Sequence, residues 1–162
     1  MNTKIIIKRM NYENPKHKKV LKSCLGTWFS NPKDLHLTDP RMSFPFKFNQ
    51  WVKISYNNKD SETWGAFSKN WMVGMCSMKK LPIEKQVHLY HIYVDKEHRR
   101  LGIGKKLIKK IIEQAKKTEM KIILLNVVAG NKVAISLYSK MGFIQEKQGQ
   151  NIRLVKIFNR KY

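Results

Sequence analysis

The chain has 162 residues, enough for one domain with a buried core of its own. It carries 33 lysine and arginine residues against 11 aspartate and glutamate residues, so its formal net charge is +22. The two cysteines, Cys24 and Cys76, have no partners at metal-binding spacing, and no apolar run approaches the roughly 20 residues of a membrane helix, which argues against a disulfide framework, a zinc site and a membrane span. We therefore expect a cytoplasmic protein that holds no metal and binds no membrane.

The first 95 residues predict a strand, a helix, an irregular region and a run of antiparallel strands. Apolar residues recur at helical spacing from Val20 to Trp28, whereas Pro32, Pro40 and Pro45 interrupt the region that follows. Stretches rich in β-branched and aromatic residues come next. In chain order we expect a strand at residues 3–10, a helix over 15–29, a loop with short elements over 30–60, a hairpin of strands at 62–69 and 70–81, and a strand at 86–95.

The rest of the chain predicts alternating helices and strands. From Ile103 to Ala115 apolar residues repeat at three-to-four spacing and most lysines fall between them, which is typical of an amphipathic helix. The nearly continuous apolar run that follows suits a strand that is buried on both faces and parallel to the strand before the helix. We expect a βαβ unit over residues 87–128, a helix at 131–141 that begins with Asn131 as its N-cap and ends at Gly142, and strands at 143–147 and 151–158 joined by a turn at 148–150.

Two glycines, Gly102 and Gly104, lie in "HRRLGIGKK" where the strand turns into the amphipathic helix. Glycine leaves the first backbone N–H groups of a helix accessible, and Arg99 and Arg100 add charge, so this turn suits an anion such as pyrophosphate. A tight turn also uses glycine, and the spacing lacks the third glycine of a dinucleotide-binding motif and the lysine of a P-loop.

Residues 99–104, "RRLGIG", fit the [RQ]-x-x-G-x-[GA] motif of the GNAT superfamily of acetyl-CoA-dependent N-acetyltransferases, which the chain resembles. The preceding "YVD" and the following helix also fit. Residues 125–143, "LNVVAGNKVAISLYSKMGF", resemble the second conserved block of that family. The matching positions there are Asn131, Ala134, Leu137, Tyr138, Gly142 and Phe143. The resemblance is good over residues 62–159 and poor over residues 1–60.

The resemblance implies an α/β (α+β) fold, one domain over residues 1–162 with a mixed, mostly antiparallel sheet. Its parallel strands at 87–95 and 121–128 would splay apart to admit acetyl-CoA. Residues 62–159 would form the acetyl-CoA-binding core and residues 1–60 the substrate-side helices and loop. The main chain at 92–94 would hold the pantetheine arm and residues 99–105 the pyrophosphate. The implied cofactor-binding residues are Ile92, Tyr93, Val94, Arg99, Arg100, Leu101, Gly102, Ile103, Gly104, Lys105, Asn131 and Tyr138.

Acetyl transfer to an amine needs a neutral amine, stabilisation of the oxyanion and a proton for the departing thiolate. Tyr138 is the candidate acid, although its place on the apolar stripe of a helix also fits core packing. His88 is the candidate base, at a strand position where several family members carry glutamate; without that glutamate, the identity of the base is open. Strand alternation predicts His91 on the opposite face. Asn131 either contacts the pantetheine or only caps its helix.

The expected acceptor is a primary amine of a small molecule, an amino acid or a peptide or protein N-terminus. So basic a chain would repel a polycationic acceptor unless Asp60 or Glu62 forms an acidic patch. Six aromatic residues either line the acceptor pocket or belong to the core: Trp28, Phe29, Phe44, Phe46, Phe48 and Trp51.

Two other classes of function remain open. One is a nucleic-acid or ribosome-binding module, in which Arg41, Lys47 and Lys53 lie among aromatic residues; we do not favour it because no known binding motif accompanies them. The other is a non-catalytic acetyl-CoA sensor on the same fold. The charge either serves an anionic partner or is a compositional bias spread along the chain, and we favour the bias. A homodimer also stays open.

Overall fold

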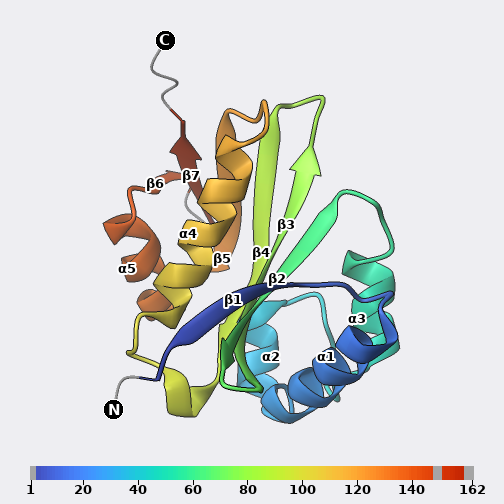
Figure 1. Cartoon of the computed structure of the whole chain (residues 1–162). Coiled ribbons are helices and arrows are strands. Elements are labelled where there is room, and N and C mark those ends of the chain that lie inside the picture. The colour runs from blue at the N-terminus through green and yellow to red at the C-terminus, as the bar shows by residue number, and fades with distance from the viewer. Residues whose placement is uncertain (1–2, 148–150, 159–162) are drawn as a thin grey trace.

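A computed structural model describes residues 3–147 and 151–158, and in that part of the chain seven strands form one sheet in the order β1-β2-β3-β4-β5-β7-β6 (Figure 1). The predicted turn at 148–150 lies outside the described residues. The elements in chain order are β1 (Ile5–Met10), α1 (Pro15–Trp28), α2 (Pro32–Thr38), α3 (Phe48–Ser55), β2 (Ser61–Ser68), β3 (Trp71–Leu81), β4 (Gln86–Val94), a 3-10 turn (Lys96–His98), α4 (Ile103–Lys116), β5 (Ile122–Val128), α5 (Lys132–Lys140), β6 (Ile144–Lys147) and β7 (Asn151–Ile157).

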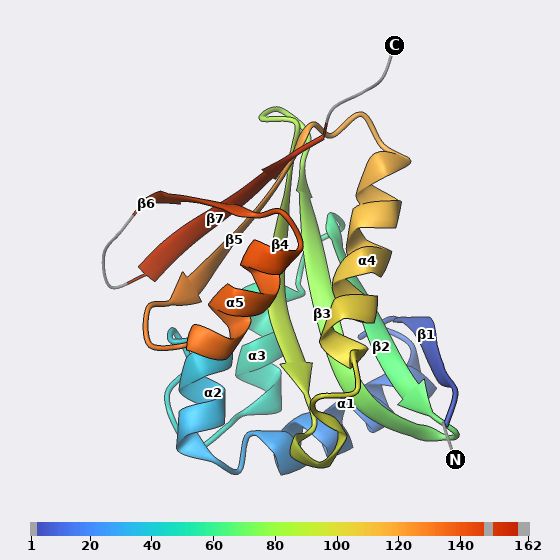
Figure 2. The ribbon, with the colours of Figure 1, turned by 90° about the vertical axis from the view of Figure 1, so that its left-hand side faces the viewer.

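The sheet is antiparallel except for one pair of strands. Strands β1 to β4 pair with their neighbours in antiparallel order, as do β5 with β7 and β6 with β7. Strands β4 and β5 are parallel, but their pairing runs only from Gln86 opposite Ile122 to His88 opposite Leu124. Beyond that point the two strands diverge (Figure 2). The mixed sheet with a splayed parallel pair is confirmed.

Helices cover both faces of the sheet. Helices α4 and α5 lie on one face and α1, α2 and α3 on the other (Figures 1 and 2). The predicted apolar stripe of α4 is buried against the sheet, and complete burial of each such side chain contributes about 1.5 to 3 kcal/mol. The fully buried residues of that stripe include Ile103, Leu107, Ile108 and Ile111.

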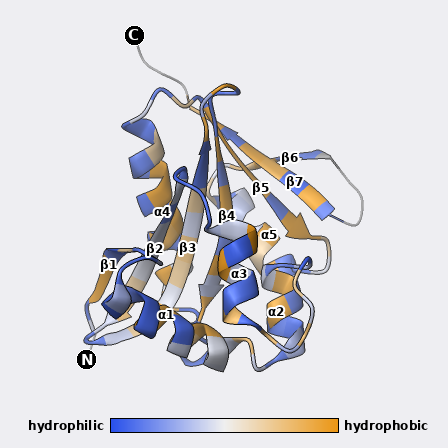
Figure 3. Cartoon of the chain, turned by 90° about the vertical axis from the view of Figure 1, so that its right-hand side faces the viewer, coloured by the Kyte–Doolittle hydropathy of each residue, from blue (hydrophilic) through white to orange (hydrophobic). Residues whose placement is uncertain are grey.

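A second core lies under α1, α2 and α3, whose outward surfaces are largely hydrophilic (Figure 3). Four of the aromatic residues considered for the acceptor pocket are buried in this core: Trp28, Phe29, Phe48 and Trp51. Phe46 is half-buried beside them, whereas Phe44 is 52% exposed. These aromatic residues therefore serve mainly as core, and Phe44 alone of the six presents most of its ring to solvent.

The irregular region predicted over residues 30–60 contains the two short helices α2 and α3. Pro32 does not break structure here, because it occupies the first turn of α2, where proline needs no hydrogen-bond partner. Asn31 caps that helix, its side-chain oxygen accepting from the backbone N–H groups of Lys33 and Asp34. Asp39, the first residue of the connection from α2 to α3 (residues 39–47), contacts His91 of β4.

A bulge interrupts the alternation of β4. Met75 of β3 pairs with Tyr93 and Ser77 with Tyr90, so the single residue Cys76 lies opposite both His91 and Ile92. His91 adopts a left-handed conformation with φ of 52°. The prediction that His91 and His88 face opposite sides of the sheet is therefore wrong, because the extra residue turns His91 toward the α1–α3 face.

Candidate active site

The N-terminus of α4 is open and positively charged. Gly102 is its N-cap, with φ of 76°, and among the described residues no side chain caps the first turn. A Cβ atom at Gly102 would meet no described atom within 4 Å, so the space in front of the helix is free. Arg100, with φ of 65°, and Lys105 are exposed beside it. Free N–H groups, the helix dipole and these cations together favour a phosphate group.

Gly104 serves a different purpose from Gly102. A Cβ atom there would lie 3.3 Å from Cδ2 of Leu137 in α5 and 3.9 Å from Cγ2 of Val94. The glycine therefore lets α4 approach α5 and the end of β4 closely. This contact brings the two predicted sequence motifs together at one end of the sheet.

Arg99 orders the turn before the helix. Its Nε donates to the backbone oxygen of Val94 at 2.9 Å, and its guanidinium lies 5.3 Å from the centre of the Tyr93 ring. These contacts fix the end of β4 to the loop at residues 99–102. The loop and the C-terminal end of β4, predicted separately as pyrophosphate and pantetheine sites, are therefore in contact through Arg99.

The main chain at Ile92, Tyr93 and Val94 lies beyond the last pair between β4 and β5, so among the described residues no strand pairs with its edge toward β5. The Tyr93 side chain points away from that edge, and its hydroxyl donates to a carboxylate oxygen of Asp34 in α2 at 3.0 Å. Burial and this carboxylate raise the pKa of Tyr93. An extended chain with amide groups, such as a pantetheine arm, fits a free strand edge.

Tyr138 lies on α5 and is only 2% exposed. Its ring packs edge-on against Phe143, with ring centres 5.5 Å apart. Burial, followed by the nearby Cys76 thiol, raises the pKa of Tyr138 well above its ordinary value, so the phenol is protonated at neutral pH, as a free tyrosine is, and is a weaker acid than a free tyrosine. Within the described residues its hydroxyl makes no hydrogen bond, which leaves the proton available to a ligand. The packing role is observed, and the acid role stays a prediction.

His88 lies on the other face of the sheet from Tyr138 and is half-buried beside Tyr90. Burial, followed by the charge of Arg41, lowers the pKa of His88 to about 4, so the ring is neutral and a weak base at neutral pH. No hydrogen bond or ring contact joins His88 to Tyr138 in the described part of the chain. Asn131 caps α5 as predicted, accepting from the N–H of Ala134 at 3.3 Å.

Three residues that the sequence did not single out as a group meet at the bulge: Asp39, Tyr56 and His91. Both nitrogens of the His91 ring lie 2.7 Å from a partner, Nε2 from Asp39 and Nδ1 from the Tyr56 hydroxyl. One sequence signal existed, because the adjacent ring residues Tyr90 and His91 break the alternation of the strand. Nothing in the sequence marked Asp39 or Tyr56, which lie in the region predicted as irregular.

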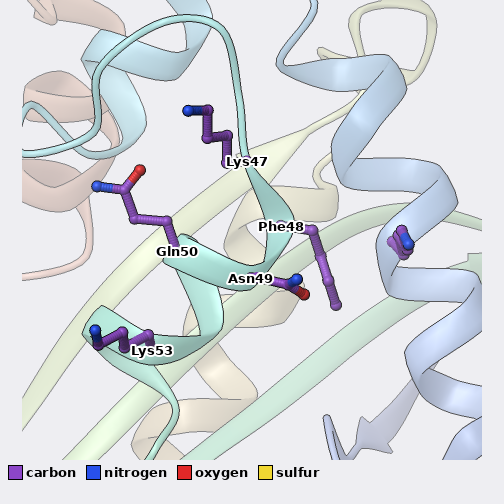
Figure 4. A pocket seen from close by; sticks show the side chains of 6 residues that line it. Lys47, Phe48, Asn49, Gln50 and Lys53 are labelled. Atoms are coloured by element: carbon purple, nitrogen blue, oxygen red, sulfur yellow. The ribbon is translucent and has the colours of Figure 1, made fainter.

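A basic cavity of about 680 Å³ lies over α3 and faces α1. Lys47, the N-cap of α3, extends on the same side as Gln50 and Lys53, whereas Phe48 and Asn49 point toward α1 (Figure 4). Lys22 of α1 also lines the cavity. Three lysines in one cavity disfavour a cationic ligand there.

Over residues 3–147 and 151–158, no group of three or more His, Cys, Asp or Glu side chains is arranged to hold a metal ion. In the same residues no helix has the length and apolar character needed to cross a membrane.

Solved structures share this fold. The N-acetyltransferase PaiA of Thermoplasma acidophilum, in complex with coenzyme A, superposes with a TM-score of 0.72 at 20% identity, covering 96% of this chain and 99% of that one. A domain from Methanocaldococcus jannaschii gives a TM-score of 0.78 at 17% identity, covering 97% of this chain and 100% of that one.

Curated relatives include human N-acetyltransferase 8, which is 35% identical over 106 residues, 62% of this chain and 45% of that protein. The alanine N-acetyltransferase of ribosomal protein bS18 from Escherichia coli is 25% identical over 114 residues, 69% of this chain and 73% of that protein. The chain spans less than half the length of the first curated relatives it matches. The profile of the acetyltransferase (GNAT) family matches residues 27–143, which is most of the chain, and the protein therefore belongs to the GNAT family.

Proposed function

We propose that this protein is an N-acetyltransferase that moves the acetyl group of acetyl-CoA directly to a primary amine. The observation that carries the proposal is that the uncapped N-terminus of α4 follows the stretch of β4 that does not pair with β5, with Arg99 holding the two together. When bound, acetyl-CoA supplies the activated thioester. The N–H groups at the start of α4, with Arg99, Arg100 and Lys105, would hold its pyrophosphate. The main chain at residues 92–94 would hold the pantetheine arm.

Tyr138 would protonate the departing thiolate, since its phenol carries a proton at neutral pH and its hydroxyl makes no hydrogen bond within the described residues. His88, neutral at neutral pH, would accept the proton of the amine, directly or through water. Direct transfer is favoured over an acetylated cysteine because burial raises the pKa of both Cys24 and Cys76, so neither forms a ready thiolate. Both thiols are free, which supports the proposed cytoplasmic location.

The acceptor would be a small-molecule amine, an amino acid or the N-terminus of a peptide or protein. Of these three classes we favour the N-terminus of a peptide or protein. Two relatives support this order by their names: N-alpha-acetyltransferase 30 of Saccharomyces cerevisiae, 27% identical over 121 residues, and the E. coli bS18-alanine enzyme. The lysines of the cavity over α3 also disfavour a polycationic amine.

The test is an acceptor screen with the purified chain and acetyl-CoA, following released thiol and the mass of the acceptor. The panel holds peptides with a free N-terminus, the same peptides with a blocked N-terminus and an internal lysine, free amino acids and spermidine. We expect acetylation of the free N-termini. Binding of acetyl-CoA without turnover of any acceptor would identify a sensor, and retention of RNA at moderate salt without acetyl-CoA binding would identify a nucleic-acid module.

A further inference from the structure

The bulge in β4 holds a residue in an unfavourable backbone conformation. His91 has φ of 52°, a region that residues with a Cβ atom adopt uncommonly, although asparagine, aspartate and histidine do so more often than the others. Such a conformation persists only where the surroundings hold it in place. The contacts of the His91 side chain show what holds it.

The imidazole of His91 is enclosed on every side. The residue is 4% exposed, and both ring nitrogens are hydrogen-bonded at 2.7 Å, to Oδ2 of Asp39 and to the hydroxyl of Tyr56. The indole of Trp51 stacks on the ring at 3.8 Å with the planes 19° apart. The ring therefore has one available position.

The two partners of His91 are themselves fixed to other elements. Asp39, before α3, accepts from Nε and Nη2 of Arg41 at 2.9 and 2.8 Å. The Tyr56 hydroxyl lies 2.7 Å from Oγ of Ser77 in β3, and Ser77 lies 2.9 Å from Oγ1 of Thr63 in β2. One chain of short hydrogen bonds thus runs from the α2–α3 connection through the bulge to β3 and β2.

The pKa shifts of His91 and Asp39 determine which atoms of this cluster carry protons. Burial lowers the pKa of His91, so its ring is neutral. Burial alone would raise the pKa of Asp39, but the hydrogen bonds from His91 and Arg41 outweigh it and hold that pKa below its ordinary value, so Asp39 is ionised. Nε2–H of His91 then donates to Asp39, and Nδ1 accepts from the Tyr56 hydroxyl. The other titratable groups that face this cluster are Arg41 beside Asp39, Tyr12 stacked on Tyr56, and His88 and Tyr90 along β4.

We propose that His91 is a positioning residue for acetyl transfer: clamped by Asp39 and Tyr56, its ring sets the orientation of the β4 main chain at residues 92–94. The inference rests on the proposed function, which places the pantetheine arm along that main chain. Asp39 belongs to the connection before α3, on the side proposed for the acceptor. The same clamp therefore joins the acceptor side of the molecule to the strand that holds the cofactor.

The central test variant is His91→Gly, which removes the ring and also relieves the left-handed backbone. We expect kcat to fall about tenfold or more, because small misplacement of reacting groups is costly, while the KM for acetyl-CoA changes less than about threefold, because residues 99–105 are untouched. Tyr56→Phe, which removes only a hydroxyl, should lower kcat in the same direction by a smaller factor, and His91→Asn should retain part of the activity because asparagine tolerates the conformation.

Lys69→Gly is the matched control. Lys69 also has a left-handed backbone, with φ of 55°, but it lies in the exposed turn between β2 and β3. This variant should leave kcat unchanged. A His91→Gly enzyme with kcat within about twofold of wild type would overturn the proposal. The proposal would also be overturned if the variant regained full activity at a lower temperature, because the loss would then reflect only reduced stability.

A binding experiment that needs no catalysis distinguishes failure of this inference from failure of the proposed function. Amide NMR signals of Ile92 and Tyr93 are followed as coenzyme A is added to the wild type and to Tyr56→Phe and His91→Gly. We expect these signals to shift in the wild type and to shift less in the variants. Equal shifts in all three proteins would overturn the clamp, whereas a wild type that binds coenzyme A but acetylates no acceptor would overturn the proposed function alone.

Discussion

Tyr138 combines two roles that one substitution can separate. Its ring packs against Phe143 in the core, and its hydroxyl makes no hydrogen bond within the described residues. Because burial raises the pKa of Tyr138, it would stay a proton donor through mildly alkaline pH. If Tyr138 is the proton donor, its own titration should therefore cause no fall in kcat at mildly alkaline pH.

Tyr138→Phe keeps the ring and removes the proton. We expect kcat to fall by a factor on the order of 10² to 10⁴, with the affinity for acetyl-CoA and the melting temperature close to wild type. Steady-state kinetics and a thermal melt check this. Ser139→Ala, which removes an exposed hydroxyl from the same helix, is the control and should keep wild-type turnover. If Tyr138→Phe also turns over normally while Tyr138→Ala loses about 3 to 5 kcal/mol of stability, the residue serves packing alone.

At the scale of single residues, the sequence identified groups within conserved motifs and missed groups assembled by the fold. Gly102 and Asn131 act locally, as the N-caps of α4 and α5, so a short-range pattern predicts them. His91 depends on a bulge, which β3 imposes through the pairing of Cys76 with two residues. Asp39 and Tyr56 reach His91 from 52 and 35 residues away, a separation that no local pattern encodes.

Among the elements, the start of α4 combines two effects of opposite sign. An acidic N-cap stabilises a helix because its oxygens accept from the free N–H groups and its charge suits the dipole, by about 0.3 to 1 kcal/mol. The same charge would repel a pyrophosphate bound at those N–H groups. Gly102 faces open space, so the effect can be tested there without crowding.

Gly102→Asp and Gly102→Asn form a matched pair, since both side chains tolerate the left-handed backbone and differ by one charge. We expect the aspartate variant to be at least as stable without ligand, yet to bind acetyl-CoA about tenfold or more weakly than the asparagine variant. Thermal melts with and without acetyl-CoA, and calorimetric titration, measure both quantities. Equal affinities in the two variants would remove the pyrophosphate from the start of α4.

The elements that the sequence predicted well are those whose pattern is long. Helix α4 and strands β3 and β5 match their predicted ranges to within two residues or so, because many apolar positions agree with one period. Helices α2 and α3 were expected only as short elements in a loop. With 7 and 8 residues, they are too short for a clear period, and tertiary burial of Leu35 and Trp51 stabilises them.

For the whole molecule, the net charge of +22 has two possible origins. It is either an excess of lysine spread evenly over the surface or a set of lysines placed to attract an anionic ligand. The cavity over α3 separates these possibilities, since it gathers Lys22, Lys47 and Lys53 on the side proposed for the acceptor. A uniform bias would make lysines anywhere on the surface equivalent. A directed field would act on the acceptor through the cavity, and salt would screen it over about 10 Å at 0.1 M.

Peptides with an acidic residue near a free N-terminus should therefore have a higher kcat/KM than matched peptides with lysine there, and the difference should shrink as salt is added. Lys47→Glu with Lys53→Glu should lower kcat/KM for the acidic peptide about three- to tenfold at low salt, since each exposed charge contributes about 0.2 to 1 kcal/mol. Lys116→Glu with Lys121→Glu, an equal change of net charge on exposed residues away from the cavity, is the control and should have little effect. Equal losses in the two double variants would show that only the total charge matters, because a ligand guided by the cavity must distinguish lysines that line it from lysines that do not.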